Sequence, residues 1–229
     1  MSFSWKRAVT ALGALVVFGL VLSGGARAAT DEQNLVDRAQ ITINDLQRDK
    51  AFGTAKTLLR RAKGVLIVPS LLKGGFFVGG EGGTGVLLVR KGAHSWSYPA
   101  FYTVASASFG LQIGGEEARV VLLALTKKGL DAFMKDQFKI GAQAGLAVVT
   151  LGSNVQAATT SALKADIVAW ASASGAYAGI TIEGSVIKPR DSYNQDYYGR
   201  ALSPASITLH NAARNPGADA LRRALAAHS

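Results

Sequence analysis

The first regular pattern along the chain is helical. Between residues 31 and 62, apolar side chains recur at intervals of three or four positions, which places them on one face of a helix. The two sets are Leu35, Ala39, Ile43 and Leu46, followed by Phe52, Ala55, Leu59 and Ala62. Gly53 marks a point at which this stretch can divide into two helices. A second helical pattern covers residues 127–139.

Most of the remaining chain carries the patterns of β-strands. Apolar, β-branched runs occupy residues 65–68, 76–78, 85–90 and 119–126, and residues 141–151 and 165–187 add further strands. Pro69 is expected to close the first run, because proline cannot donate to a strand ladder. The glycine-rich segment 79–85 is expected to form a tight connection between two strands.

The order of these elements predicts an α+β fold. Strands run in sequence between the helical regions, without regular βαβ alternation. Residues 165–187 are rich in alanine and glycine, which permit sharp curvature of a sheet. We therefore expect a strongly curved, mainly antiparallel sheet, approaching a barrel, with an N-terminal amphipathic helix across it and a mid-chain helix.

The N-terminal segment predicts export. Lys6 and Arg7 precede an apolar stretch, and Ala26 and Ala28 supply the small residues that signal peptidase reads. We predict a signal peptide at residues 1–28, cleavage after Ala28 and a periplasmic protein. The alternative is a retained anchor, because the apolar stretch is near the lower length limit for crossing a bilayer.

The mature chain is predicted to contain one domain, residues 29–200, followed by a polar, basic tail, residues 201–229. In this tail, Leu221 and Leu225 indicate at most a short, weakly held amphipathic helix.

The amino-acid composition excludes cysteine chemistry and indicates a basic surface. The chain has no cysteine, so it cannot carry a disulfide, a thiolate–metal site or a lipid on a cysteine. Its formal net charge is +10, and loss of Lys6, Arg7 and Arg27 leaves 22 basic and 15 acidic residues, a net charge of +7. A basic surface attracts anionic partners. Because the protein is predicted to be exported, nucleic acid is the least expected of these anionic partners.

Catalytic patterns are weak. Gly80–Gly85 matches the dinucleotide pattern G-x-G-x-x-G, but that motif requires a helix to follow, and a strand is predicted there. The three histidines, His94, His210 and His228, show no metal-ligand spacing. We therefore predict no enzyme, no cofactor and no metal site.

A basic cluster ends the first helical region. Cations suit a helix C-terminus, but four of them within eight residues exceed what a cap requires. Each Lys or Arg near an anionic membrane contributes on the order of 1 kcal/mol. The alternative is a solvated helix face. The candidate lipid-binding residues are Lys56, Arg60, Arg61, Lys63, Lys73, Phe76 and Phe77.

An aromatic cluster follows the third strand run. Its members are Trp96, Tyr98, Phe101 and Tyr102. A place in the core is favoured, because large aromatic rings contribute much buried area. The alternative is a belt at the membrane interface.

Four segments, in order, resemble the SYLF domain, a lipid-binding family. They are Ala62–Ile67 (AKGVLI), the glycine-rich blocks 74–79 and 83–86, Trp96–Pro99 (WSYP) and Gly110–Gly114 (GLQIG). The motif residues expected to be structural are Gly74, Gly75, Gly83, Gly85, Trp96, Pro99, Gly110, Gln112 and Gly114.

The resemblance implies binding of phosphoinositides or other anionic lipids, partly through a basic amphipathic helix, and actin bundling in some eukaryotic members. An exported protein would meet neither actin nor phosphoinositides in its own envelope. We therefore expect the surface of an anionic phospholipid membrane as the partner. The alternative is a structural or protein-interaction module with a protein partner in the envelope.

Overall fold

The computed structural model describes residues 30–48, 53–75, 78–109, 114–142, 144–150, 164–173 and 184–227. The helices are α1 Asp31–Arg48, α2 Gly53–Arg61, α3 Lys127–Phe133, α5 Asp191–Tyr198, α6 Pro204–Thr208, the 3₁₀ turn η2 Pro216–Ala218, and α7 Asp219–Ala226. The strands are β1 Gly64–Gly75, β2 Val78–Gly92, β3 Ser95–Trp96, β4 Ala100–Phe109, β5 Gly114–Ala124, β6 Phe138–Lys139, β7 Leu146–Thr150, β8 Ile167–Ala173 and β9 Val186–Pro189.

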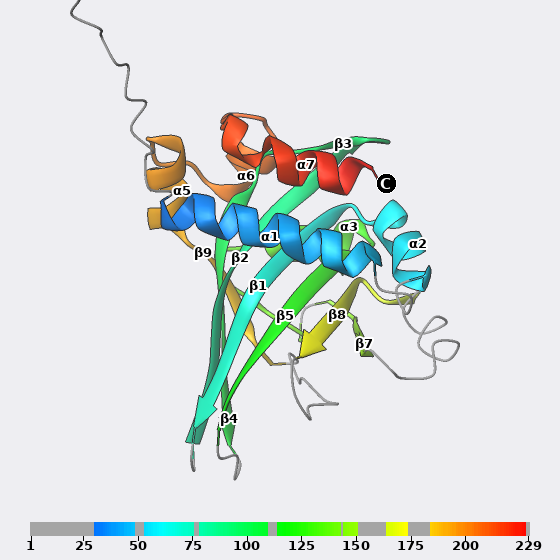
Figure 1. Cartoon of the computed structure of the whole chain (residues 1–229), viewed down its shortest axis with the longest axis vertical. Coiled ribbons are helices and arrows are strands. Elements are labelled where there is room, and N and C mark those ends of the chain that lie inside the picture. Colours follow the sequence, from blue (N-terminus) through cyan, green and yellow to red (C-terminus); the bar gives the residue numbers. More distant parts are fainter. Residues whose placement is uncertain are drawn as a thin grey trace, which may run out of the picture.

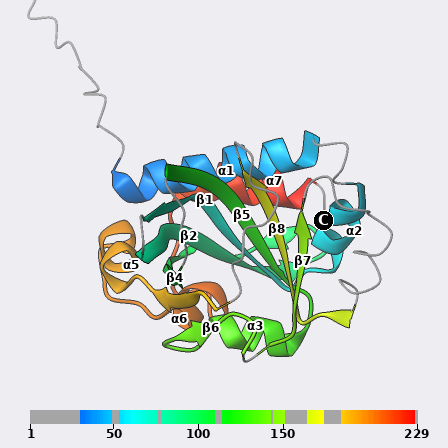
Figure 2. The same ribbon diagram turned by 90° about the horizontal axis from the view of Figure 1, so that it is seen from below.

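The strands form one nine-stranded sheet in the order β6-β9-β4-β2-β1-β5-β8-β7, with β3 paired to β2. Every pairing is antiparallel except that of β7 with β8. The sheet is strongly curved, and α1 and α7 lie side by side on one of its faces (Figures 1 and 2). The α+β class and the mainly antiparallel sheet are therefore confirmed.

Helices cover both faces of the sheet. One core cluster joins α1, α2 and α7 to alternate strand residues such as Val65, Ile67 and Val86, and the other joins the opposite residues, such as Leu66 and Val68, to α3 and α6. This two-sided cover explains why the run 65–68 is continuously apolar, since side chains alternate between the faces. We call the first face the α1 side.

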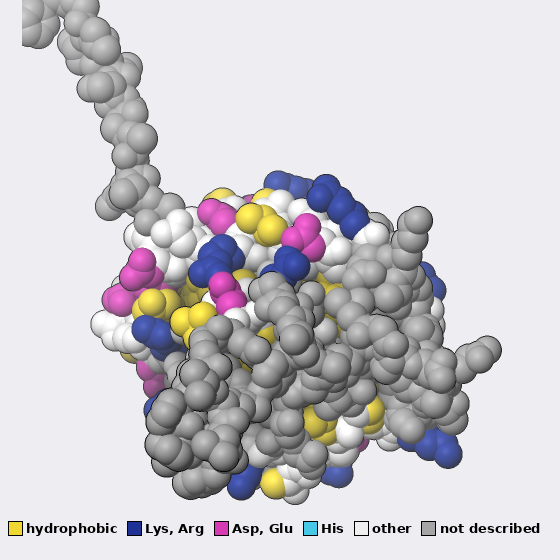
Figure 3. Space-filling model, turned by 60° about the horizontal axis from the view of Figure 1, so that its bottom comes forward, with side chains coloured by type: hydrophobic (Ala, Val, Ile, Leu, Met, Phe, Trp, Pro, Cys, Tyr) yellow, Lys and Arg dark blue, Asp and Glu magenta, His cyan; other side chains and the backbone are white. Residues whose placement is uncertain are grey.

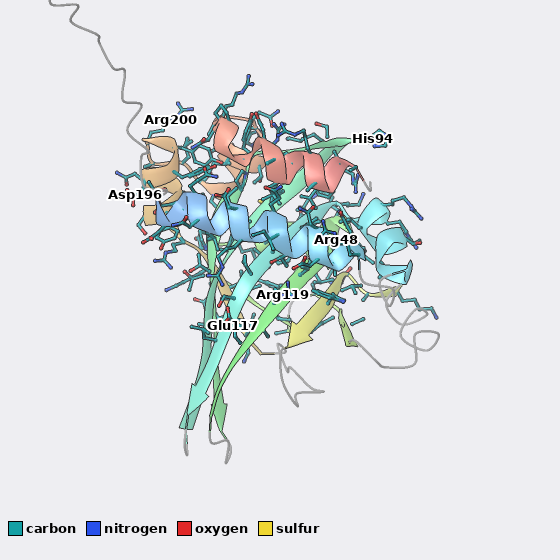
Figure 4. All side chains as sticks on the ribbon, viewed as in Figure 1. Arg48, His94, Glu117, Arg119, Asp196 and Arg200 are labelled. Carbon is teal, nitrogen blue, oxygen red and sulfur yellow. The ribbon has the colours of Figure 1, made fainter. Side chains whose placement is uncertain are left out.

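Two ion pairs attach α1 to β5. The Arg119 guanidinium lies 2.6 Å from the Asp45 carboxylate, and that of Arg38 lies 3.1 Å from Glu117. Figure 4 shows Glu117 and Arg119 below α1 on the same face of the sheet. Because these side chains are partly exposed, each pair contributes at most about 1 kcal/mol. The buried α1 residues, such as Ile43 and Leu46, supply most of the attachment.

Pro69 does not end the first strand, which corrects the sequence prediction. On β1, Val68 and Pro69 together lie opposite the single residue Gly85 of β2, a β-bulge within a strand that continues to Gly75. A bulge is one of the few places where a strand accommodates proline, because the extra residue need not donate to the ladder. The bulge also bends the strand and so promotes curvature of the sheet.

The glycine-rich segment is a strand and not a connection, which is a second correction. Residues 79–85 lie in β2 and pair with β1 on one side and β4 on the other. A Cβ atom on Gly83 would lie 2.5 Å from the Ser70 carbonyl oxygen, and one on Gly85 would lie 2.7 Å from that of Ile67. These glycines therefore allow β2 to approach the bulge closely.

The helices in the second half of the chain differ from those that the sequence pattern predicted. α3 ends at Phe133, not at 139, and β6 follows it. The tyrosine-rich segment after Pro189, where no helix was predicted, forms α5, and the aromatic rings of Tyr193 and Tyr197 pack edge-on against Phe101. The core placement of the aromatic cluster is confirmed, since Trp96, Phe101 and Tyr102 are buried.

The C-terminal segment also differs from the weakly held helix that was expected. Leu221 and Leu225 of α7 are fully buried. Asp219 accepts hydrogen bonds from Tyr98 at 2.9 Å and from Arg222 at 2.7 Å, and these bonds hold the pKa of its carboxyl below the usual value. Arg222 also donates to the Trp96 carbonyl oxygen at 2.9 Å. The bond to Trp96 attaches α7 to the sheet, and the two leucines pack into the core cluster that contains α1.

Candidate functional site

The end of α2 separates apolar from basic side chains. Leu58, Leu59 and Ala62 are buried against the core, whereas Arg60, Arg61 and Lys63 are exposed. The three buried residues hold the end of the helix against the sheet, and the three cations face solvent on its other side. We call Arg60, Arg61 and Lys63 the α2 cluster.

A different cation caps α2. The Arg90 guanidinium, from β2, donates to the carbonyl oxygens of Leu59 at 2.6 Å and Ala62 at 2.7 Å. It lies 4.3 Å from the centre of the Trp96 ring, and burial lowers its pKa. Arg90 therefore satisfies the last carbonyl groups of the helix, which was the structural role considered for the α2 cluster. Sequence reasoning did not single out Arg90.

The α2 cluster forms no ion pair with an acidic residue within the described part of the chain. There, Arg61 and Lys63 form no side-chain hydrogen bond or ion pair, and Arg60 bonds only to the Thr57 hydroxyl, at 3.3 Å. On the face shown in Figure 3, the visible Asp and Glu side chains lie mainly toward the left and top.

Two further exposed cations lie on the same side of the molecule as the α2 cluster. Arg48, whose side chain is 81% exposed, ends α1 at the end next to α2 (Figure 4). Lys164 is exposed just before β8, which begins on the same side of the molecule as α2 (Figures 1 and 2). Neither was predicted, because only the folded arrangement brings these segments to the same side.

The other candidate lipid-binding residues do not join the α2 cluster. Lys73 lies nine residues along β1 from Gly64, or about 30 Å at the usual rise of a strand. The strand register also places it between Glu81 and Glu116. Lys56 belongs to α2, but its side chain lies outside the described part of the structure, as do Phe76 and Phe77 entirely.

The described SYLF motif residues lie in the packed sheet. Gly74 and Gly75 end β1, Gly83 and Gly85 face the bulge, and Gly114 begins β5. Trp96 is buried beneath Arg90. Pro99 is also buried, and its carbonyl oxygen accepts a hydrogen bond from Tyr198 at 2.6 Å. Gly110 and Gln112 lie outside the described residues.

Neither a metal-binding group nor a membrane-spanning helix is found among the described residues. Within the described ranges, no three His, Asp or Glu side chains are grouped to hold a metal ion. No described helix is both long enough and apolar enough to cross a membrane.

A family model described as "Las17-binding protein actin regulator", Ysc84, matches residues 105–228, which is more than half of the chain. The chain belongs to the Ysc84 family. This is the SYLF family that the sequence motifs indicated, so the resemblance is confirmed. The matched region includes α5, α6 and α7, whereas the α2 cluster lies before it.

Relatives occur in yeast and mammals. The chain is 28% identical to "LAS seventeen-binding protein 3" of Saccharomyces cerevisiae over 82% of its own length and 42% of that protein. It is 28% identical to "SH3 domain-containing YSC84-like protein 1" of Bos taurus, over 73% of this chain and 49% of that protein. The chain thus spans less than half of each of these curated relatives. No solved structure gives a significant match.

Proposed function

We propose that this member of the Ysc84 family is an exported, non-catalytic binding domain that contacts anionic phospholipid membranes through the α2 cluster. The observation that carries the proposal is that Arg60, Arg61 and Lys63 are exposed and unneutralised by described residues while Arg90 caps the helix. An exposed basic surface of this kind attracts an anionic membrane, whereas the helix end does not need these cations as a cap.

The strength expected of such a contact is moderate. Three cations near an anionic surface contribute roughly 3 kcal/mol together. Their attraction to lipid headgroups is screened by salt, because the charges are exposed to solvent. Binding should therefore be reversible and should weaken as the ionic strength rises.

Charge reversal tests this contact. We expect Arg60→Glu/Arg61→Glu to lower binding to vesicles of phosphatidylglycerol and phosphatidylcholine by about 30-fold or more, equivalent to roughly 2 kcal/mol. Co-sedimentation over a series of salt concentrations measures the effect. Lys139→Glu/Arg214→Glu is the matched control, since it reverses two exposed charges on β6 and before η2. The proposal fails if unmodified protein binds neutral and anionic vesicles equally, or if the two double variants behave alike.

Export is a separate part of the proposal. It is supported by the basic residues Lys6 and Arg7, the apolar stretch after them and the small residues that end at Ala28. We expect protein recovered from a bacterial periplasm to begin at Ala29, as measured by intact mass. A chain that retains Met1 and fractionates with the membrane would instead identify residues 1–28 as an anchor.

A protein partner is the second candidate function. The yeast relative is named for binding another protein, LAS seventeen, and an acidic protein surface would satisfy the same α2 cluster. A stoichiometric protein that co-purifies with the unmodified chain but not with the Arg60→Glu/Arg61→Glu variant, in the absence of any vesicle binding, would favour this function.

A further inference from the structure

A row of polar side chains crosses the α1 side of the sheet, away from the α2 cluster. The strand registers place Ser70 of β1 opposite Thr84 of β2, Thr84 opposite Thr103 of β4, and Thr103 opposite Lys188 of β9. Directly opposite residues share a face, with Cβ atoms about 5 Å apart. The neighbouring row toward the core, Ile67, Val86 and Phe101, is fully buried. The polar row therefore lies where the apolar core ends.

Arg190 is held over this row by a hydroxyl group and an aromatic ring. Its guanidinium donates to the Thr84 hydroxyl at 2.8 Å and lies 3.6 Å from the centre of the Tyr193 ring. It is half-buried, yet no described carboxylate forms an ion pair with it, including that of the adjacent Asp191. A partly desolvated guanidinium held by neutral groups retains its charge and several N–H donors.

Lys188 supplies a second cation at the edge of the same row. It is exposed on β9, the strand that lies beside α5 in Figure 1, and it forms no ion pair with a described residue. The Thr84 hydroxyl accepts from Arg190 and so can still donate its own hydrogen, and Thr103 adds a second hydroxyl between the two cations.

We infer that Arg190, Lys188, Thr84 and Thr103 form a binding site for a phosphate group, separate from the α2 cluster. A phosphate presents several oxygens that accept hydrogen bonds. Guanidinium, ammonium and hydroxyl donors on one face match that arrangement. The group can belong to a lipid headgroup or to a soluble phosphorylated compound, since both present the same oxygens.

Titration of the mature chain with inorganic phosphate tests the site. We expect phosphate, compared with chloride at equal ionic strength, to shift the amide resonances of Thr84, Thr103 and Lys188. Lys188→Glu should weaken this response about fivefold or more, since each cation removed from near an anion has roughly that effect. Arg223→Glu, at an exposed position of α7, is the matched control. Thr103→Val should also weaken the response, because it removes one donor without removing charge.

Further comparisons separate the source of the phosphate and the two sites. Vesicles of phosphatidic acid in phosphatidylcholine that bind less well to Lys188→Glu than to Arg223→Glu would identify a lipid headgroup. Unchanged vesicle binding with a lost phosphate response would identify a soluble ligand. Arg60→Glu/Arg61→Glu should keep the phosphate response. An absent response, or one removed by that variant and kept by Lys188→Glu, would overturn the site.

Discussion

Gly83→Ala is expected to lower the free energy of unfolding by about 3 kcal/mol, whereas Gly82→Ala should leave it nearly unchanged. The two glycines are neighbours in β2 and in the same glycine-rich segment. A Cβ atom on Gly83 would lie 2.5 Å from the Ser70 carbonyl oxygen and 3.1 Å from the Val68 side chain, but one on Gly82 meets no atom within 4 Å. The same substitution therefore tests two different environments.

The cost arises because the obstructing atom is backbone. The Ser70 carbonyl belongs to the bulge that accommodates Pro69, and moving it would disturb the pairing of β1 with both β2 and β5. Gly85→Ala should act in the same way, since its Cβ atom would approach the Ile67 carbonyl oxygen at 2.7 Å. A loss of this size is a large part of the 5–15 kcal/mol typical of a folded domain.

Urea unfolding followed by circular dichroism would measure these differences. The decisive quantity is the difference between Gly83→Ala and Gly82→Ala, because both variants make the same change in the unfolded chain. Equal stability of the two would mean that β1 and β2 do not approach so closely at the bulge. The glycines of the SYLF motif would then need another explanation, such as a binding role.

The sequence predictions were correct where structure depends on local interactions and wrong where it depends on residues far apart in the sequence. α1 and α2 were predicted because helix periodicity is a local signal, and Gly53 begins α2 as expected. The bulge and the glycine strand were missed because they depend on each other. Pro69 ends an isolated strand pattern, and residues 79–85 look like a turn until β1 and β4 are placed on either side.

The same distinction applies to the candidate site. Arg60, Arg61 and Lys63 could be identified because they are close together in the sequence and end a helical pattern. Arg90 could not, because the carbonyl groups that it caps are about 30 residues away in the sequence. The row of Thr84, Thr103 and Lys188 exists only through strand register, which no local pattern specifies.

Leu221→Ala is the second substitution with a large expected effect, a loss of about 3 kcal/mol of unfolding free energy. Leu221 is fully buried in the core cluster that contains α1 residues such as Val36 and Ile43. Removing most of its side chain leaves a cavity that the surrounding helices cannot fully close. Leu225→Ala should have an effect of similar size, because Leu225 is also fully buried.

Hydrogen bonds from α1 make this region part of the domain. The Gln33 side chain donates to the Gly217 carbonyl oxygen at 3.0 Å, and that of Gln47 donates to the Ala224 carbonyl oxygen at 3.1 Å. These bonds come from the two ends of α1, and they attach it to the η2 turn and to α7. Loosening α7 should therefore also raise hydrogen exchange in α1 and alter the fluorescence of Trp96, whose carbonyl oxygen accepts from Arg222.

Arg223→Ala is the matched control, since Arg223 is an exposed residue of the same helix. Denaturant unfolding should separate Leu221→Ala from Arg223→Ala by about 3 kcal/mol, because only the first creates a cavity. If the two variants were equally stable, α7 would contribute little to the stability of the domain. A large difference would instead mean that any truncation used to map the α2 cluster or the phosphate site must retain the chain through α7.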